Sequence, residues 1–262
     1  MAIIKSHEAG TFCYAELASA DPIASGRFYT ELLGWQQNDE DMGELGIYTQ
    51  FTLDGAVVSA QYQLPSDQQQ AGSPSFWGQY ISVEDCDAST AKAQALGGET
   101  VAGPMDVMDL GRMTILKDPQ GAVFQLWQAG KNCGVGILDA PGAMVWNELM
   151  TSDTDGAGKF YTNLFGWGTE VKDMGEMGSY TMWTRGEARP GGGMMTIPPG
   201  KEMIPPHWLV YFAVTDPDAI AQKSVALGGK VIVPPTDIPN AGRFAVVQDP
   251  VGAVFGIFTY AK

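Results

Sequence analysis

Two glutamates stand at equivalent positions in a sequence pattern that occurs twice, and their surroundings suit them to acid–base chemistry or ligand binding. Glu16 follows Tyr14 by two residues, and Glu148 follows Trp146 by two residues. Burial beside aromatic rings disfavours the charged form of a carboxyl group, so each glutamate is a candidate general base or an anchor for a cationic or hydroxylated ligand. The alternative is a structural glutamate that hydrogen-bonds to a neighbouring strand or to an arginine.

A histidine is the third candidate for proton transfer. The chain has two histidines: His7 lies in the N-terminal segment, and His207 lies just before a predicted strand. The alternation of side chains places His207 on the same strand face as Leu209 and Tyr211. The alternative is a histidine at the rim that stacks on Trp208. The predicted catalytic candidates are therefore Glu16, Glu148 and His207.

Aromatic and polar side chains on the strand faces that point away from the helices are candidates for ligand binding. Large aromatic surfaces with a few polar ends suit flat or hydrophobic small molecules. The alternative is that these rings fill a closed core, as side chains do in small barrels. The predicted ligand-binding residues are Tyr14, Tyr80, Gln125, Trp127, Trp146 and Tyr211.

Strand alternation decides which side chains share a face. Cys13, Ala15 and Leu17 are expected to pack on a helix. The opposite face then carries Phe12, Tyr14, Glu16 and Ala18, and its counterpart in the second copy carries Met144, Trp146, Glu148 and Met150. Each sheet should therefore present a concave, aromatic-rich surface that contains a carboxylate. We call this surface a cup.

The repeat extends over nearly the whole chain and predicts its division into domains. FYTELLGW at residues 28–35 returns as FYTNLFGW at 160–167, and DPQGAVF at 118–124 returns as DPVGAVF at 249–255. We predict two homologous domains, at residues 11–130 and 143–260, joined by a linker at 131–142.

A weaker repeat lies inside each domain. Asp21 and Pro22 predict the start of a helix that ends at Gly34, because aspartate favours the N-cap, proline the first helical position and glycine the position after the last turn. Runs of β-branched and aromatic residues predict strands before and after each helix. The predicted unit is one strand, one helix and three strands, present four times. Ion pairs are predicted to clamp two loops, Asp106 with Arg112 and Asp237 with Arg243.

These motifs, in this order and repeated twice, resemble the vicinal oxygen chelate superfamily, which contains glyoxalases, bleomycin-resistance proteins and extradiol dioxygenases. The segment PMDVMDLGRM at residues 104–113 resembles tandem-domain members that are described as glyoxalase-like or as hydroxylases. The resemblance implies an α+β fold in which four βαβββ modules form two curved mixed sheets, each around a cup with helices outside.

Metal-dependent members of this superfamily hold their ion with a histidine on the first strand of a module and a glutamate or glutamine on its last strand. The matching positions here are Tyr14 and Trp146, Gly78 and Leu209, and Gln125 and Gly256. A divalent metal needs three or four converging nitrogen or oxygen ligands, which this set does not supply. We therefore predict no metal ligands and no cofactor. The alternative is a divalent metal at a divergent site.

Composition limits the partners and the compartment. The net charge of −15 repels a phosphate backbone, so nucleic acid is not an expected partner. The three cysteines show no paired spacing that predicts a disulfide framework or a zinc site. The sequence contains no apolar run of about 18 residues and no secretory signal at Met1–Gly10. We expect a cytoplasmic protein that does not bind membranes.

The predicted function is metal-free binding of a small aromatic or amphipathic molecule. The alternative is an enzyme, either a glyoxalase-like lyase or a dioxygenase or hydroxylase, whose divergent site combines Glu148 with His207 or Glu16 with Gln125. A third possibility is an interaction protein whose cups are filled by its own side chains. The chain is expected to be a monomer whose two domains form an internal pseudo-dimer, or else a homodimer.

Overall fold

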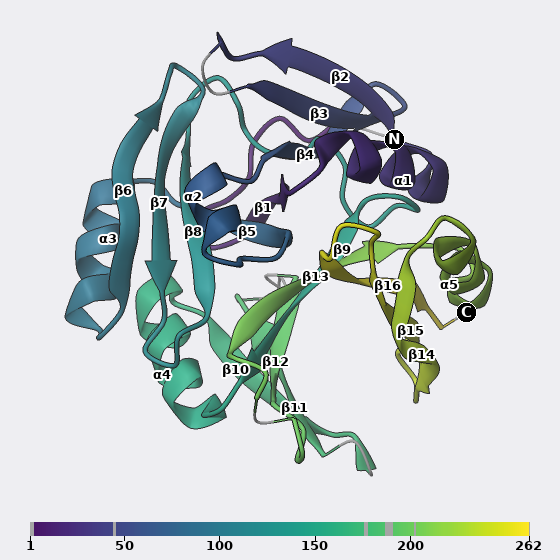
Figure 1. Cartoon of the computed structure of the whole chain (residues 1–262). Coiled ribbons are helices and arrows are strands. Elements are labelled where there is room, and N and C mark those ends of the chain that lie inside the picture. The colour runs from purple at the N-terminus through teal and green to yellow at the C-terminus, as the bar shows by residue number, and fades with distance from the viewer. Residues whose placement is uncertain (1–2, 44–45, 176–177, 187–190, 202, 262) are drawn as a thin grey trace.

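The computed structural model describes residues 3–43, 46–175, 178–186, 191–201 and 203–261, and two eight-stranded sheets dominate it (Figure 1). The first sheet contains β1 (Phe12–Ser19), β2 (Gln36–Asp41), β3 (Ile47–Leu53), β4 (Ala56–Gln63), β5 (Phe76–Ser82), β6 (Glu99–Val107), β7 (Gly111–Lys117) and β8 (Val123–Ala129). The second contains β9 (Met144–Thr151), β10 (Gly168–Asp173), β11 (Ser179–Thr184), β12 (Gly192–Thr196), β13 (His207–Ala213), β14 (Lys230–Ile238), β15 (Gly242–Gln248) and β16 (Val254–Tyr260). The helices are α1 (Pro22–Leu33), α2 (Ser66–Gln70), α3 (Cys86–Ala95), α4 (Thr154–Phe165) and α5 (Pro217–Ala226).

The order of strands confirms the predicted βαβββ unit and the α+β class. The first sheet runs β2-β3-β4-β1-β5-β8-β7-β6, and the second repeats this order as β10-β11-β12-β9-β13-β16-β15-β14. Parallel pairs join β1 to β4 and β5 to β8, whereas β1 and β5 are antiparallel, so each sheet is mixed. Two modules therefore meet at the centre of each sheet, where β1 and β5, or β9 and β13, lie side by side.

The ends of the first helix follow the sequence signals. Oδ1 of Asp21 accepts a hydrogen bond from the Ala24 N–H at 3.0 Å, and Pro22 occupies the first helical position. Gly34 ends the helix with a φ of 78°, a left-handed conformation that costs glycine little. Asp153 and Gly166 do the same for α4. The predicted helix ends are thus confirmed at both copies of this motif.

The two repeated motifs meet each other across the domain interface. The Tyr29 hydroxyl in α1 donates to Oδ2 of Asp249 in the second domain at 3.1 Å, and it accepts the Trp77 indole N–H at 3.0 Å. In the equivalent contact of the other copy, the Tyr161 hydroxyl in α4 donates to Asp118 in the first domain at 3.0 Å. Trp208 donates to Tyr161 at 2.9 Å. Each aspartate thus joins the two domains through Oδ2, while its Oδ1 accepts the backbone N–H of Ala122 or Ala253 in its own turn.

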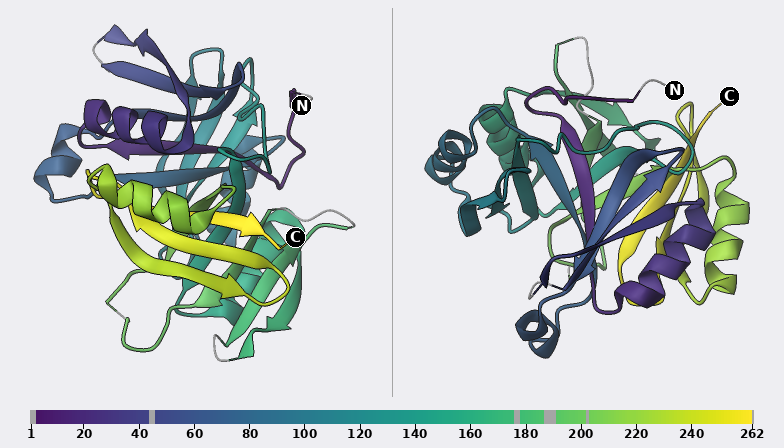
Figure 2. Two further views of the ribbon diagram at one scale, coloured as in Figure 1. Left: turned by 90° about the vertical axis from the view of Figure 1, so that its right-hand side faces the viewer. Right: turned by 90° about the horizontal axis from the view of Figure 1, so that it is seen from above.

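Aromatic packing surrounds these hydrogen bonds. Helix α1 lies beside α5 of the other domain, as Figure 2 shows, and the ring of Tyr29 lies 5.3 Å from that of Phe255. Across the pseudo-symmetry axis, Phe124 lies 5.5 Å from Tyr161. One cluster of buried side chains runs through both domains, so the helices on the outer faces of the sheets form much of the interface.

Two arginines clamp loops as predicted, and each uses a further aspartate. Nη1 of Arg112 lies 2.8 Å from Asp106, and its Nε lies 2.6 Å from Asp87 at the start of α3. Arg243 bridges Asp237 and Asp218 in the same way in the second domain. Each arginine therefore ties a strand hairpin to the helix of its module.

The predicted orientation of the first residue in each leading strand is wrong. A β-bulge separates Phe12 from Tyr14, so Phe12 pairs with Ile81 and turns away from the cup. Its ring packs instead against Trp208 of the second domain at 5.2 Å. A matching register shift directs Met144 into the core. An extra residue in one strand reverses the parity that alternation alone predicts.

None of the helices in the described part of the chain has the length and apolar character needed to cross a bilayer.

Substituting Tyr29 by phenylalanine should destabilise the protein by about 1–3 kcal/mol, because it leaves a buried carboxylate oxygen and a buried indole N–H without a partner. Urea unfolding at pH 7 measures the change. Tyr62→Phe is the control, since its hydroxyl makes no hydrogen bond with the described residues. Equal stabilities for the two variants would contradict the role assigned to the Tyr29 hydroxyl.

Candidate functional site

Glu16 lies at the centre of the first cup and is held by two tyrosines. The Tyr48 hydroxyl donates to one carboxylate oxygen at 2.7 Å, and the Tyr80 hydroxyl donates to the other at 2.7 Å. Burial raises the pKa of Glu16, and the two tyrosine hydrogen bonds oppose this shift only in part. No arginine or lysine among the described residues forms an ion pair with this carboxylate.

The other predicted residues of the first cup pack around this carboxylate. The hydroxyls of Tyr14 and Tyr48 lie 3.2 Å apart, and the ring of Tyr14 lies 6.0 Å from that of Tyr80. The rings of Trp127 and Tyr80 pack edge to face, with their centroids 6.1 Å apart. The Trp127 indole N–H donates to the backbone oxygen of Asn132. Tyr14, Tyr80 and Trp127 are each at most 7% exposed.

Gln125 completes the first cup by occupying space that a glycine leaves. A Cβ atom at Gly78 would collide with the Gln125 amide, so that amide lies directly over β5. Gly78 is itself the strand partner of Glu16. Oε1 of Gln125 is buried and has no hydrogen-bond partner among the described residues. This oxygen is therefore an unpaired acceptor of an amide that lies over the strand next to that of Glu16.

The second cup repeats the arrangement around Glu148. The Tyr211 hydroxyl donates to Oε2 of Glu148 at 2.9 Å, and Tyr180 is a second hydrogen-bond partner. The Trp146 indole N–H donates to the Tyr180 hydroxyl at 2.7 Å. Burial raises the pKa of Glu148, and the two tyrosines counteract it. The tyrosine ring at 211 covers Gly256, where a Cβ atom would overlap it.

His207 in β13 shares the cup face with Glu148 in β9, but it is displaced along the sheet by two residues from the position opposite Glu148. Leu209 pairs directly with Glu148, whereas His207 pairs with Met150. The Nδ1 atom of His207 lies 2.9 Å from the Pro205 carbonyl oxygen. The neighbouring Trp208 points to the opposite face of the strand, where its indole contacts Tyr161. The alternative interpretation, in which His207 stacks on Trp208, does not describe the contact that this indole makes.

The two cups differ in how far their side chains are exposed. In the first cup, the four predicted ligand-binding residues are buried. In the second, Trp146 and His207 are partly exposed and Tyr211 is buried, while Glu16 and Glu148 are partly exposed alike. The second cup therefore offers more of its surface to a ligand.

Two tyrosines that bind the cup carboxylates, one in β3 and one in β11, were not predicted from the sequence. Tyr48 in β3 and Tyr180 in β11 stand 132 residues apart, which is the spacing of the repeat. Tyr62 in β4 also approaches Glu16, whose charge contributes to raising the pKa of its hydroxyl. The repeat spacing was the signal that could have found Tyr48 and Tyr180.

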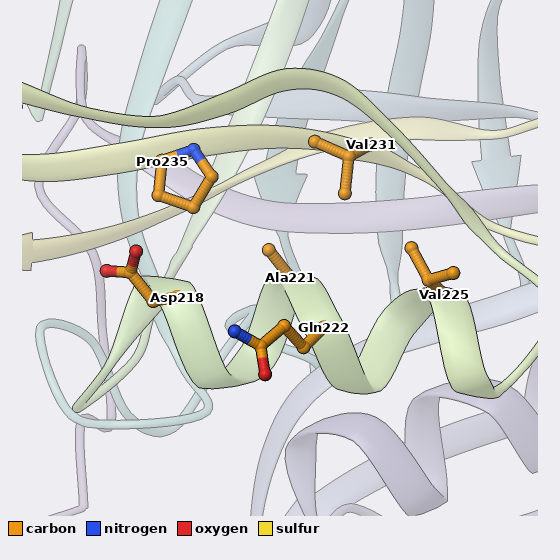
Figure 3. A pocket seen from close by; sticks show the side chains of 6 residues that line it. All are labelled: Asp218, Ala221, Gln222, Val225, Val231 and Pro235. Carbon is orange, nitrogen blue, oxygen red and sulfur yellow. The ribbon is translucent and has the colours of Figure 1, made fainter.

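A surface hollow of about 360 Å³ lies outside both cups, between α5 and β14 (Figure 3). Val225 and Val231 form its apolar walls, and Asp218 lies at one end. That aspartate is already bound by Arg243. Apart from Asp218, the one polar side chain among the six described lining residues is that of Gln222.

The donors in the cups do not fit the metal site that the resemblance implies. Gly78, Leu209 and Gly256 carry no donor side chain, and both oxygens of Glu16 already accept tyrosine hydrogen bonds. Burial also raises the pKa of Tyr14, so its phenol stays protonated at neutral pH and is a poor ligand. Among the described residues, no group of three or more histidine, cysteine or carboxylate side chains converges on one point.

Comparison with known proteins settles the family. The model of the glyoxalase/bleomycin resistance protein/dioxygenase superfamily matches residues 11–126 and again 135–257. The chain belongs to this superfamily. The two matches confirm the resemblance inferred from the repeated motifs and the two tandem glyoxalase-like units.

Relatives in the superfamily share the full tandem arrangement. The chain is 39% identical to the "Putative glyoxylase CFP32" of Mycobacterium bovis, covering 95% of this chain and 94% of that protein. It is 36% identical to the anthracycline biosynthesis protein DnrV of Streptomyces peucetius, covering 95% and 92%.

Solved structures show the same fold at low sequence identity. The Mn(II)-bound glyoxalase of Novosphingobium aromaticivorans superposes with a TM-score of 0.65 at 15% identity, covering 95% of this chain and 82% of that one. The 2,3-dioxygenase LapB of Pseudomonas sp. KL28 superposes with a TM-score of 0.65 at 14% identity, covering 100% and 95%.

Titration with Mn²⁺, Ni²⁺ or Zn²⁺ should reveal no saturable site that depends on the cup glutamates, because the three or four converging ligands that such an ion needs are not found among the described residues. Isothermal titration calorimetry of the parent and of the Glu16→Gln/Glu148→Gln double variant measures this. One stoichiometric ion in the parent, absent from the double variant, would show that the carboxylates do bind a metal.

Proposed function

We propose that the second cup binds a planar aromatic molecule that carries a hydrogen-bond donor, and that it does so without a metal. The observation that carries this proposal is the partly exposed aromatic surface around Glu148, where Trp146 is partly exposed although its counterpart Tyr14 is buried. Flat ligands need a wide apolar wall and a small number of fixed polar groups.

The apolar wall comes from five strands of the second sheet, β9, β11, β12, β15 and β16. Met182 pairs with Gly193, which pairs with Glu148, so these residues share the cup face. On the other side of Glu148, Phe244 pairs with Phe258. The partly exposed apolar side chains on this face are Trp146, Met150, Met182, Met195, Phe244 and Phe258. Methionine adapts its shape to a ring, and tryptophan and phenylalanine stack on it.

Glu148 is the polar anchor in this proposal. A carboxylate has more acceptor positions than two tyrosine hydroxyls occupy, so a ligand hydroxyl or amine can donate to it as well. Donation to an ionised oxygen is stronger than donation to a neutral one. The Tyr211 and Tyr180 bonds hold the carboxylate in place before the ligand arrives, which reduces the entropy that binding costs.

The names of relatives agree with a ligand of this shape. One relative is named for anthracycline biosynthesis, and an anthracycline contains a planar, hydroxylated ring system. The first cup has a smaller part in this proposal, because Tyr14, Tyr80 and Trp127 are buried against one another.

The raised pKa of Glu148 favours a second candidate function, proton transfer. A carboxylate that is less stable than in water is a stronger base, so Glu148 could remove a proton from the hydroxyl-bearing carbon of a 2-oxoaldehyde–thiol adduct. The same carboxyl would return the proton to the neighbouring carbon. The hydroxyl proton passes through solvent to the former carbonyl oxygen, which completes a glyoxalase-type isomerisation with Glu148 as the acid and base at carbon. A relative's name includes glyoxylase.

Binding of 2,6-dihydroxyanthraquinone at pH 6.5, measured by the quenching of tryptophan fluorescence, tests the proposal. We expect one saturable site that Glu148→Gln weakens about tenfold, because a neutral amide accepts a weaker hydrogen bond than a carboxylate. Glu16→Gln is the matched control and should leave the affinity unchanged. The 2,6-dimethoxy analogue, which lacks donors, should bind as weakly to the parent as the hydroxylated probe binds to Glu148→Gln.

Equal effects of the two glutamine variants, or binding that EDTA abolishes, would overturn the proposed binding function. The same variants address proton transfer through turnover of the methylglyoxal–glutathione adduct. That candidate requires measurable turnover that falls at least about a hundredfold in Glu148→Gln and persists in Glu16→Gln. Absence of turnover in the parent rejects it.

A further inference from the structure

A cavity of about 280 Å³ lies between the two domains, away from both cups. Its walls come from the N-terminal segment around His7, from the segment at Leu138 and Asp139, and from β9 at Met144 and Val145. Of the described residues that line it, none is a cup glutamate or one of the tyrosines bonded to those glutamates. It is thus separate from the proposed ligand site.

In the first domain, the chain itself fills the equivalent groove. The Val135 N–H donates to the Cys13 carbonyl oxygen at 2.8 Å. The next residue, Gly136, donates its N–H to Val57 at 2.7 Å. The repeat spacing of 132 makes Val145 the counterpart of Cys13, and Val145 lines the cavity. One wall of the cavity therefore corresponds to the stretch of β1 to which Val135 donates in the first domain.

The walls of the cavity offer hydrogen-bond acceptors. His7 donates its Nε2–H to the Val135 oxygen at 2.9 Å, because a carbonyl can only accept. Burial lowers the pKa of His7 and favours its neutral ring, so Nδ1 carries a lone pair. Asn147 also lines the cavity and is 1% exposed. Its Oδ1 has no hydrogen-bond partner among the described residues.

Asp139 adds a negative charge at the mouth of the cavity. Its exposed side chain forms no hydrogen bond or ion pair with the described residues. Glu8, the other acidic residue at the cavity, is neutralised by Arg185 at 2.7 Å. No lysine or arginine is among the described residues that line the walls. The charge of Asp139 is therefore available to a cation.

Apolar side chains complete the walls, chiefly Ile4, Phe12 and Met144. From the acceptors, the unpaired carboxylate and this apolar surface, we propose that the cavity binds an organic ammonium ion with a small apolar body. The ammonium group bonds to Asp139 and to the acceptors beside it, and the body lies against Phe12 and Met144. The overall charge of −15 also attracts a cation.

Isothermal titration calorimetry with phenethylamine at pH 7.5 tests this site. We expect one saturable site, with 2-phenylethanol, which has the same shape but no charge, binding at least about tenfold more weakly. Asp139→Asn should weaken phenethylamine binding by about tenfold. Asparagine suits this position because the backbone φ there is 57°, which asparagine tolerates.

Asp54→Asn is the matched control, because Asp54 is also exposed, also has a positive φ of 50°, and lies outside the cavity. It should leave the affinity unchanged, and so should Glu148→Gln, which tests the cup. Equal affinities for the amine and the alcohol would overturn the proposal. So would equal effects of Asp139→Asn and Asp54→Asn, or loss of amine binding in Glu148→Gln.

Discussion

Buried carboxylates that are held by tyrosine hydroxyls, with no cationic partner, are the constraint on which this structure depends. Glu16, Glu148, Asp118 and Asp249 all accept tyrosine hydrogen bonds, and burial raises the pKa of each, that of Asp249 to about 6. A buried charge without such bonds is too costly to keep. The two aspartates join the domains, and the two glutamates lie one in each cup.

The duplication explains why these contacts come in matched pairs, and it leaves the two copies free to diverge. The interface uses both copies of each motif: Tyr29 contacts Asp249, and Tyr161 contacts Asp118. Loss of either tyrosine hydroxyl would leave a buried aspartate oxygen of the other domain without its partner. The cups have no such mutual dependence. The first buries Tyr14, Tyr80 and Trp127, whereas the second exposes Trp146 and a methionine-rich wall.

The sequence predicted the modules, the helix ends and the shared face of Glu16 with Tyr14 and Tyr80, because local signals and alternation determine them. It did not predict β2, whose six residues are all exposed and show no apolar alternation. The orientation of Phe12 toward the domain interface was not predicted either, because a β-bulge depends on how two strands pair and not on the sequence of one strand. The pairing of Tyr29 with Asp249 spans 220 residues, and no spacing in the chain indicates which motif meets which.

The ionisation of the two cup glutamates tests the central claim most directly. Their side-chain carboxyl carbons can be followed by ¹³C nuclear magnetic resonance as the pH is raised, with Glu16→Gln and Glu148→Gln assigning the signals. Tyrosine-held carboxylates without a cation should titrate above the ordinary glutamate value of about 4.3, and the proton should leave later than from an exposed glutamate. Titration at or below that value would mean that an unrecognised positive charge, such as a metal or a basic side chain, stabilises the carboxylates instead.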